Sequence, residues 1–382
     1  MPITLVASGA LALASFQSLT TTAADHTQMR PMSAPFAGVL YADIPYYPGA
    51  TKCTPSTSGP CPSIPAGSTQ CLDVRVPQTI VHPKPTILFV HGGGWGAGDK
   101  NSTEGNIHSV RSFLDNVASL GYRVVSCNYT LSCDDPATPT VYDAPSFPHA
   151  VRDVRAAIGW IRTHGALAPY ELSECIVLVG ASAGAHLAAM AGALNTDNVH
   201  YAPVGYETAD LSVQLTVAYS ADFDMFRRGC TTTLCPCEGC GLRPHVHAAG
   251  FVNEPGGISQ QFVGQVWGVP APGYLPWPCP SGPWDYTTFA PGSTTGDPFL
   301  NASPVHWLHP ASSPFYVFQS RCDLFTPLDD HAWMTQATAQ AGVSYAEDIQ
   351  PCGHGLRIHG GVVSANKLNQ VIQFWSGYTH CP

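Results

Sequence analysis

The chain has 382 residues, of which 45% are hydrophobic, and this apolar content is enough to bury a sizeable core in one large domain. Charged residues make up only 11%, against the ~25% typical of soluble domains, and Gly and Pro are abundant, which favours long uncharged loops. The net charge is −10, with 16 Lys and Arg and no basic run. This argues against a nucleic-acid partner, because neutralising phosphates requires clustered cations. A monomer is expected.

The N-terminal region, residues 1–24, predicts a secretory signal peptide. An apolar stretch covers residues 3–16, and small residues follow at Ala23 and Ala24. No Lys or Arg precedes the stretch, so a buried N-terminal helix is the alternative. The stretch is shorter than the ~20 residues of a membrane-spanning helix, and no membrane span is predicted. The 14 cysteines, an even number, agree with export, because disulfides persist in oxidising compartments. A secreted, extracellular or periplasmic location is expected.

Residues 25–70 are rich in Pro, Ser, Thr and Gly, which predicts an extended arm, held by disulfides at Cys53 and Cys61. Residues 71–382 predict one α/β domain, in which strands and helices alternate. The strands are expected at residues 72–76, 87–90, 124–126, 176–179, 215–219, 315–318 and 343–349. Helices are expected at residues 149–162, 183–194, 332–341 and 365–375. This alternation predicts a mostly parallel central sheet with helices on both faces, as in the α/β-hydrolase fold.

An insertion at residues 222–300 interrupts the alternation. It contains five cysteines, namely Cys230, Cys235, Cys237, Cys240 and Cys279. In an exported chain these favour disulfides, and a zinc site with His245 and His247 is the alternative. The aromatic residues of the insertion either form a local core or make a lid or platform for substrate.

The strongest motif is the Gly-Ala-Ser-Ala-Gly of residues 180–184, which lies between a predicted strand and an Ala-rich helix. A strand, a sharp turn with small residues and a helix are the context of the nucleophile elbow. In this context Ser182 is the predicted nucleophile, held above the sheet at a helix N-terminus.

A second motif, His-Gly-Gly-Gly-Trp at residues 91–95, directly follows another predicted strand. A tetrahedral intermediate needs backbone N–H groups aimed at its oxyanion, and consecutive glycines allow the backbone to approach that closely. We expect Gly93, Gly94 and Ala183 to supply these donors. Trp95, next to them, is expected to wall the acyl pocket.

A serine nucleophile needs a base, and the base needs an acid that orients it. Asp323 follows the predicted strand at 315–318, and His354 lies in a Gly-flanked loop after the last predicted strand. These two are the predicted acid and base. Asp329 and Asp330 are alternatives for the acid, although both are also expected to cap the next helix, and His359 is an alternative for the base.

Two cysteines, Cys322 and Cys352, flank the predicted acid and base. A disulfide between them would hold the acid and base loops in register, although pairing does not follow from sequence.

These motifs resemble those of the α/β-hydrolases of the hormone-sensitive-lipase and acetylxylan/feruloyl-esterase-like groups. The similarity extends from about residue 72 to residue 375. It is carried by residues 91–95, 128–129, 147–148, 153, 180–187, 302–304, 323 and 354. The resemblance implies carboxylic ester hydrolysis without a cofactor or metal. The family usually has arginine at the position of Thr130, so the structural contact of that arginine is not expected here.

The sequence thus predicts a serine carboxylic ester hydrolase that acts through an acyl-enzyme. An extracellular location and aromatic loops favour esters attached to plant polysaccharide, such as acetyl or feruloyl groups. A lipase or polyesterase is the first alternative, and a peptidase, which would normally need a further large domain, is the second. A non-catalytic hydrolase-fold binding module is the alternative of another class, but such modules lose triad residues that this chain retains.

Overall fold

The structure is a computed structural model that describes twelve parts of the chain. These are residues 36–50, 70–79, 84–102, 110–132, 147–197, 199–225, 234–235, 245–246, 298–323, 325–326, 328–358 and 361–376. All of them belong to one unit, Ala34–Pro382. The predicted signal peptide, most of the predicted arm and most of the insertion lie outside the described residues. None of the helices in the described ranges is long and apolar enough to cross a membrane.

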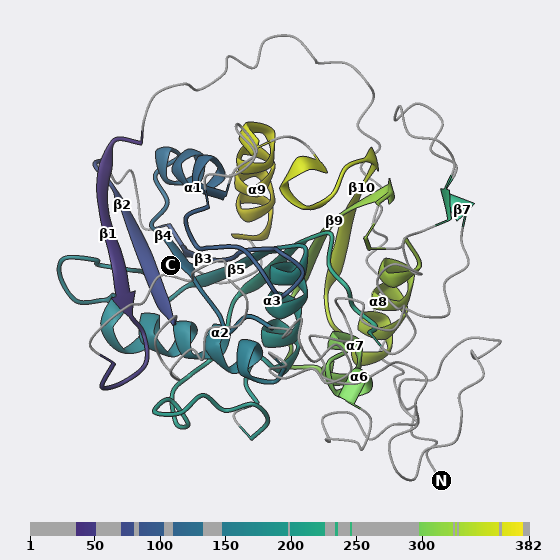
Figure 1. The fold of residues 1–382 in the computed structure, drawn as a ribbon, viewed down its shortest axis with the longest axis horizontal. Helices are drawn as coiled ribbons and strands as arrows, with labels where there is room; N and C mark the ends of the chain where they lie inside the picture. The colour runs from purple at the N-terminus through teal and green to yellow at the C-terminus, as the bar shows by residue number, and fades with distance from the viewer. Residues whose placement is uncertain are drawn as a thin grey trace, which may run out of the picture. The chain divides into compact units, whose positions relative to one another are not determined.

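An eight-stranded sheet forms the centre of this unit (Figure 1). Its strands are β1 (Gly38–Pro45), β2 (Cys71–Pro77), β3 (Thr86–Val90), β4 (Val124–Cys127), β5 (Ile176–Ala181), β6 (Leu215–Tyr219), β9 (Phe315–Cys322) and β10 (Tyr345–Cys352). The spatial order is β1-β2-β4-β3-β5-β6-β9-β10. Strand β2 is antiparallel to both of its neighbours, and all the other pairs are parallel. The carboxyl ends of β3, β5, β6, β9 and β10 therefore meet at one edge of the sheet.

Helices cover both faces of the sheet. Successive residues of β3 enter two different cores, with Ile87 in one and Leu88 in the other, because side chains alternate across a strand. On one face α1 (Val110–Ser119) packs against α9 (Gly361–Ser376), as Figure 1 shows. The opposite face carries α2 (His149–Trp160), continued by the π-helical turn Ile161–Gly165, together with α3 (Ala183–Leu194) and α8 (Leu328–Ala341). The short helices are α6 (Pro298–Asn301), α7 (Pro304–Trp307) and the 3-10 turn Gly355–Ile358.

The predicted α/β-hydrolase sheet, mostly parallel and covered on both faces, is confirmed. Two elements of the central sheet and its covering helices were not predicted. Strand β1 lies within the predicted arm and extends the sheet at its edge. Helix α1 carries the helical pattern in its buried residues Phe113, Leu114, Val117 and Ala118, so its signal is present in the sequence. Strands β9 and β10 both run further than predicted, and their register places the Cα atoms of Cys322 and Cys352 opposite each other.

Thr130, at the position where the family usually has arginine, belongs to a hydrogen-bond network around the buried Asp153. Thr130 donates to Asp153 Oδ2 from both its N–H and its hydroxyl, at 2.7 and 2.6 Å, and the Tyr47 hydroxyl donates to Asp153 Oδ1 at 2.7 Å. Burial raises the pKa of Asp153 above its ordinary value, although these hydrogen bonds oppose the shift. The groups that donate to this buried carboxyl are therefore neutral.

The cysteines of the described residues are in two states. Cys71, Cys175 and Cys352 are disulfide-bonded, and Cys127 is a buried free thiol. A two-stranded sheet, β7 (Leu234–Cys235) with β8 (His245–Val246), places the Cα atoms of Cys235 and His245 opposite each other. The side chains of the insertion's cysteines lie outside the described residues, so their pairing stays a prediction.

Candidate active site

The turn between β5 and α3 holds Ser182 in a strained conformation. Its φ is 55° and its ψ −125°, and its N–H donates to the Tyr219 carbonyl at 2.8 Å. The two flanking glycines have no room for a side chain. A Cβ at Gly180 would lie 2.2 Å from the Gly184 carbonyl oxygen, and one at Gly184 would lie 2.2 Å from the Val90 carbonyl oxygen. The local sequence therefore dictates the turn that raises the Ser182 hydroxyl above the sheet.

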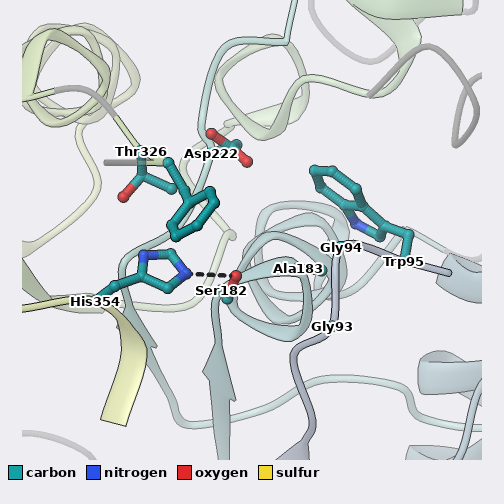
Figure 2. Close-up of a pocket in the computed structure, with 9 residues that line it drawn as sticks. Gly93, Gly94, Trp95, Ser182, Ala183, Asp222, Thr326 and His354 are labelled. Carbon is teal, nitrogen blue, oxygen red and sulfur yellow. Dashed lines mark hydrogen bonds between the residues drawn. The ribbon is translucent and has the colours of Figure 1, made fainter. Parts of the chain in front are cut away.

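Hydrogen bonds join Ser182, His354 and Asp323 in series. The Ser182 hydroxyl lies 2.8 Å from His354 Nε2, and His354 Nδ1 lies 2.8 and 2.9 Å from the two Asp323 oxygens (Figure 2 draws the first contact). A carboxylate only accepts, so Nδ1 carries the proton and Nε2 is left to accept from the hydroxyl. Strands far apart in the sequence bring these three residues together at one sheet edge.

The acid of this series is fully buried and held ionised. Burial by itself would raise the pKa of Asp323, but His354 and the N–H of Phe325 outweigh it and keep the pKa below the ordinary value. The N–H groups of Phe325 and Thr326 donate to Asp323 Oδ1 at 2.9 and 3.1 Å. The carboxylate is therefore available to orient the imidazole and to stabilise its charged form.

Of the residues that the sequence offered as alternatives for the acid and the base, the structure describes only the side chain of Asp330. Asp330 accepts a hydrogen bond from the Asp224 N–H at 3.1 Å, inside the first turn of α8. Helix α8 begins at Leu328, so Asp330 lies within the helix and the predicted cap is wrong for this residue. The side chain of Asp329 and all of His359 lie outside the described residues.

The glycine loop after β3 forms another wall of the site. Gly93 and Gly94 line the pocket beside Ser182 and Ala183 (Figure 2). The Gly93 carbonyl accepts from the N–H groups of Gly96 and Ala97 at 3.2 and 3.0 Å, which fixes the loop. His91 stacks on Tyr129 with 4.4 Å between ring centroids, and burial lowers the pKa of His91 to about 4, so this ring is neutral.

Trp95 lines the pocket while its side chain stays buried, at 1% exposure. Its indole Nε1 donates to His186 Nδ1 at 3.2 Å, and His186 Nε2 donates to the Ala302 carbonyl at 2.7 Å. These contacts fix the indole from α3, the helix that follows the elbow. Nine residues line a cavity of about 300 Å³, namely Gly93, Gly94, Trp95, Ser182, Ala183, Asp222, Phe325, Thr326 and His354. Within the described residues, no cluster of His, Cys, Asp and Glu is placed to hold a metal.

Comparisons with known proteins find a family model and named esterases. Residues 72–234 match the family model described as BD-FAE. Esterase LipQ of Mycobacterium tuberculosis (strain ATCC 25618 / H37Rv) is 26% identical over 314 residues, which cover 80% of this chain and 59% of LipQ. The chain thus spans about three fifths of the length of this curated relative.

Solved structures share the fold at low sequence identity. A truncated form of carbohydrate esterase from gut microbiota gives a TM-score of 0.61 at 15% identity, covering 90% of this chain and 99% of that one. Esterase B from Lactobacillus Rhamnosis (HN001) gives 0.56 at 15% identity, covering 90% of this chain and 88% of that one. The chain has the α/β-hydrolase fold. Its elbow, glycine loop and acid and base loops occupy the carboxyl edge of the sheet, where ligands bind in open α/β folds.

Several residues around the site were missed by sequence reasoning. Ser220 follows β6 with a φ of 56° and is fully buried. Its hydroxyl accepts from the Gly355 N–H at 2.9 Å, and its hydrogen bond to Asp323 lowers the pKa of that carboxyl. Ser220 thus contacts both the acid and the base loop. The only sequence signal was its place after a strand of the sheet.

Phe325 and Asp222 were also missed. The Phe325 ring lies 4.8 Å from the His354 ring, and Asp222 lines the pocket although the sequence assigned it to the insertion. Neither residue belongs to a motif. Their place beside the pocket becomes visible only once the loops are assembled.

Proposed function

We propose that the chain is a serine carboxylic ester hydrolase that acts through an acyl-enzyme. The observation that carries the proposal is the hydrogen-bonded series of Ser182, His354 and Asp323 beneath a cavity lined by a glycine loop. The names of the relatives, which are esterases, support the same reaction class.

The reaction begins when Ser182 Oγ attacks the ester carbonyl carbon and transfers its proton to His354 Nε2. Asp323 stabilises the resulting imidazolium, because the carboxylate is already ionised and aligned with Nδ1. The imidazolium then gives its proton to the leaving alcohol oxygen. A water molecule, deprotonated by His354, attacks the acyl-enzyme, releases the acid and restores Ser182.

Backbone N–H groups of Gly93, Gly94 and Ala183 stabilise the oxyanion that develops in each of these steps. All three residues line the cavity next to Ser182. Ala183 is the first residue of α3, so its N–H is not used within the helix and the helix dipole adds to the positive potential there. Removing one such donor from related sites costs about 10²–10³ in kcat.

The proposed substrate is an ester attached to plant polysaccharide, with an acetyl or feruloyl acyl group. The name of one structural relative, a carbohydrate esterase, supports a carbohydrate substrate. We further propose that the enzyme is secreted and works as a monomer. The apolar stretch of residues 3–16 and the even number of cysteines support secretion, which N-terminal sequencing of exported protein tests.

The test compares wild type with Ser182→Ala on nitrophenyl esters of increasing chain length, acetylated xylan and methyl ferulate. We expect the variant to lose about 10⁴–10⁶ in kcat on every substrate that wild type hydrolyses. Activity of the variant within tenfold of wild type would overturn the nucleophile. Preference for long acyl chains would favour a lipase or polyesterase, and no hydrolysis at all would favour a binding module.

A further inference from the structure

We propose that Asp222 determines specificity, by accepting a hydrogen bond from a free hydroxyl on the alcohol portion of the substrate. The site then selects esters of polyols and sugars over esters of simple alcohols. This inference rests on the proposed ester hydrolysis and names the recognition element of the same site.

The position of Asp222 is set by the sheet. Strand β6 ends at Tyr219, and Asp222 follows it at the same edge of the sheet as Ser182. Asp222 is only 3% exposed, yet it lines the cavity above the nucleophile. Figure 2 shows its carboxylate across the cavity from Gly93, on the side away from the glycine loop. Asp222 and Thr326 line the same cavity as the glycine loop, so a substrate whose carbonyl oxygen points to that loop can direct its alcohol portion toward them.

Five of the nine lining side chains carry a polar group, namely Trp95, Ser182, Asp222, Thr326 and His354. The Trp95 indole N–H donates to His186 Nδ1, and Ser182 and His354 are hydrogen-bonded to each other. The Thr326 hydroxyl accepts from Gln319 Nε2 at 3.1 Å and keeps its proton to donate. Asp222 is the one carboxylate among the nine, so it is the lining side chain suited to accept from a substrate donor.

The chemistry of Asp222 limits what it recognises. A carboxylate has acceptor oxygens only, so the substrate group that fits is a donor. A buried site built to bond a hydroxyl rejects the analogue that lacks it, because the site is then left without that bond. An anionic group near the ester would be repelled by the same charge. A cationic donor would also satisfy a carboxylate, and the experiment below separates it from a hydroxyl.

Phe325 supplies an apolar surface on the base side of the cavity. Its ring lies 4.8 Å from the His354 ring and is 39% exposed. The leaving oxygen must reach His354 Nε2, so the alcohol carbons lie next to this ring. An aromatic face with a carboxylate acceptor in the same cavity matches a sugar ring, which has apolar faces and hydroxyl edges.

The experiment uses two matched pairs of acetates. We compare trans-2-hydroxycyclohexyl acetate with cyclohexyl acetate, and choline acetate with its neutral isostere 3,3-dimethylbutyl acetate. Each pair is measured with wild type, Asp222→Ala, Asp222→Asn and the control Glu207→Gln, which removes one negative charge from an exposed position. Circular dichroism and the Tm verify folding, and Asp222→Asn serves alone if Asp222→Ala does not fold.

We expect wild type to prefer the hydroxylated acetate by about 10- to 100-fold in kcat/KM, as a hydrogen bond to a charged group allows. Asp222→Ala should lose this preference, so that its kcat/KM for the hydroxylated acetate falls to its own kcat/KM for cyclohexyl acetate, and Asp222→Asn should reduce the preference. Glu207→Gln should retain it.

Three results would overturn the inference. They are no preference in wild type, a preference that survives in both Asp222 variants, and a selective gain for choline acetate. An equal loss on both cyclohexyl acetates in a folded variant would instead place Asp222 in the reaction itself. Failure of the proposed function is distinguishable, because wild type would then hydrolyse none of the four acetates.

Discussion

Asp153 and Asp323 are both buried and both accept several hydrogen bonds, but burial raises the pKa of the first, while the second has a pKa below its ordinary value. The donors to Asp153 are the neutral groups of Thr130, Tyr47 and Gln70. Asp323 has neutral donors too, but it also faces the imidazole of His354, which takes a positive charge.

The difference shows which partner overcomes desolvation. Neutral hydrogen bonds reduce the cost of burying a carboxylate, whereas an adjacent group that becomes charged reverses the sign of the pKa shift. At the flank of the sheet, where Thr130 stands in place of the family's arginine, the Asp153 carboxyl has a structural role. At the edge that carries the proposed triad, the ionised Asp323 is placed to stabilise an imidazolium.

The largest expected effect comes from exchanging each carboxyl for its amide. Asp323→Asn should lower kcat by about 10⁴, because the amide no longer holds His354 in the tautomer that accepts from Ser182. Asp153→Asn, the matched control, should change kcat by less than about threefold, while its effect appears in the free energy of unfolding. Steady-state kinetics and urea unfolding of both variants measure this. A large kcat loss in Asp153→Asn would show that the two sites are coupled.

The second effect concerns Ser220, which joins the acid and base loops. Ser220→Ala should lower kcat by about tenfold, the equivalent of ~1.4 kcal/mol, with KM unchanged, because the hydroxyl positions Asp323 and Gly355 rather than substrate. Ser312→Ala is the control, since it removes a buried hydroxyl that donates to the Ala193 carbonyl at 2.6 Å. Its Tm should fall while kcat stays the same. If Ser220→Ala and Ser312→Ala had equal kcat values, the role of Ser220 would be structural only.

The third effect concerns the cysteines of the same two regions. Cys352 is disulfide-bonded two residues before His354, and Cys127 is a buried free thiol at the flank. We predict that Cys352 pairs with Cys322, its register partner across β9 and β10. Mild reduction should then lower kcat several-fold before the fold is lost, without exposing Cys127 to alkylation. Peptide mapping of the unreduced protein identifies the bond, and a different partner for Cys352 would refute the pairing.

The smallest effect is on the pH dependence of stability. The lowered pKa of Asp323 means that its contribution is present above the unfolded value of ~3.9 and is lost as the pH falls below it. The raised pKa of Asp153 has the opposite sign, so its contribution is full below ~3.9 and is lost as the pH rises through the folded pKa. The free energy of unfolding of wild type relative to Asp323→Asn should therefore rise with pH. The same quantity relative to Asp153→Asn should fall with pH. Denaturant unfolding between about pH 2 and pH 7 measures both slopes.

Much of the molecule follows from contiguous residues. The apolar runs predicted the strands from β2 to β6 together with β9 and β10. The Gly-Ala-Ser-Ala-Gly turn determined the elbow, since a Cβ at Gly180 or Gly184 would strike backbone. The acid and base could be predicted because each loop directly follows a strand, and the carboxyl ends of parallel strands meet at one edge. Helix α1 carried an equally local pattern and was overlooked.

The tertiary structure decided what depends on distant segments. Strand β1 has no strong pattern of its own and is defined by its pairing with β2. Ser220, Asp222 and Phe325 belong to no motif, and they reach the site because β6 and β9 are neighbours in the sheet although about a hundred residues apart in the chain. Spacing along the sequence carries no information about such contacts. Hydrogen bonds, burial and pKa shifts arise from the groups that meet in three dimensions, so the catalytic edge acquires its surroundings only on folding.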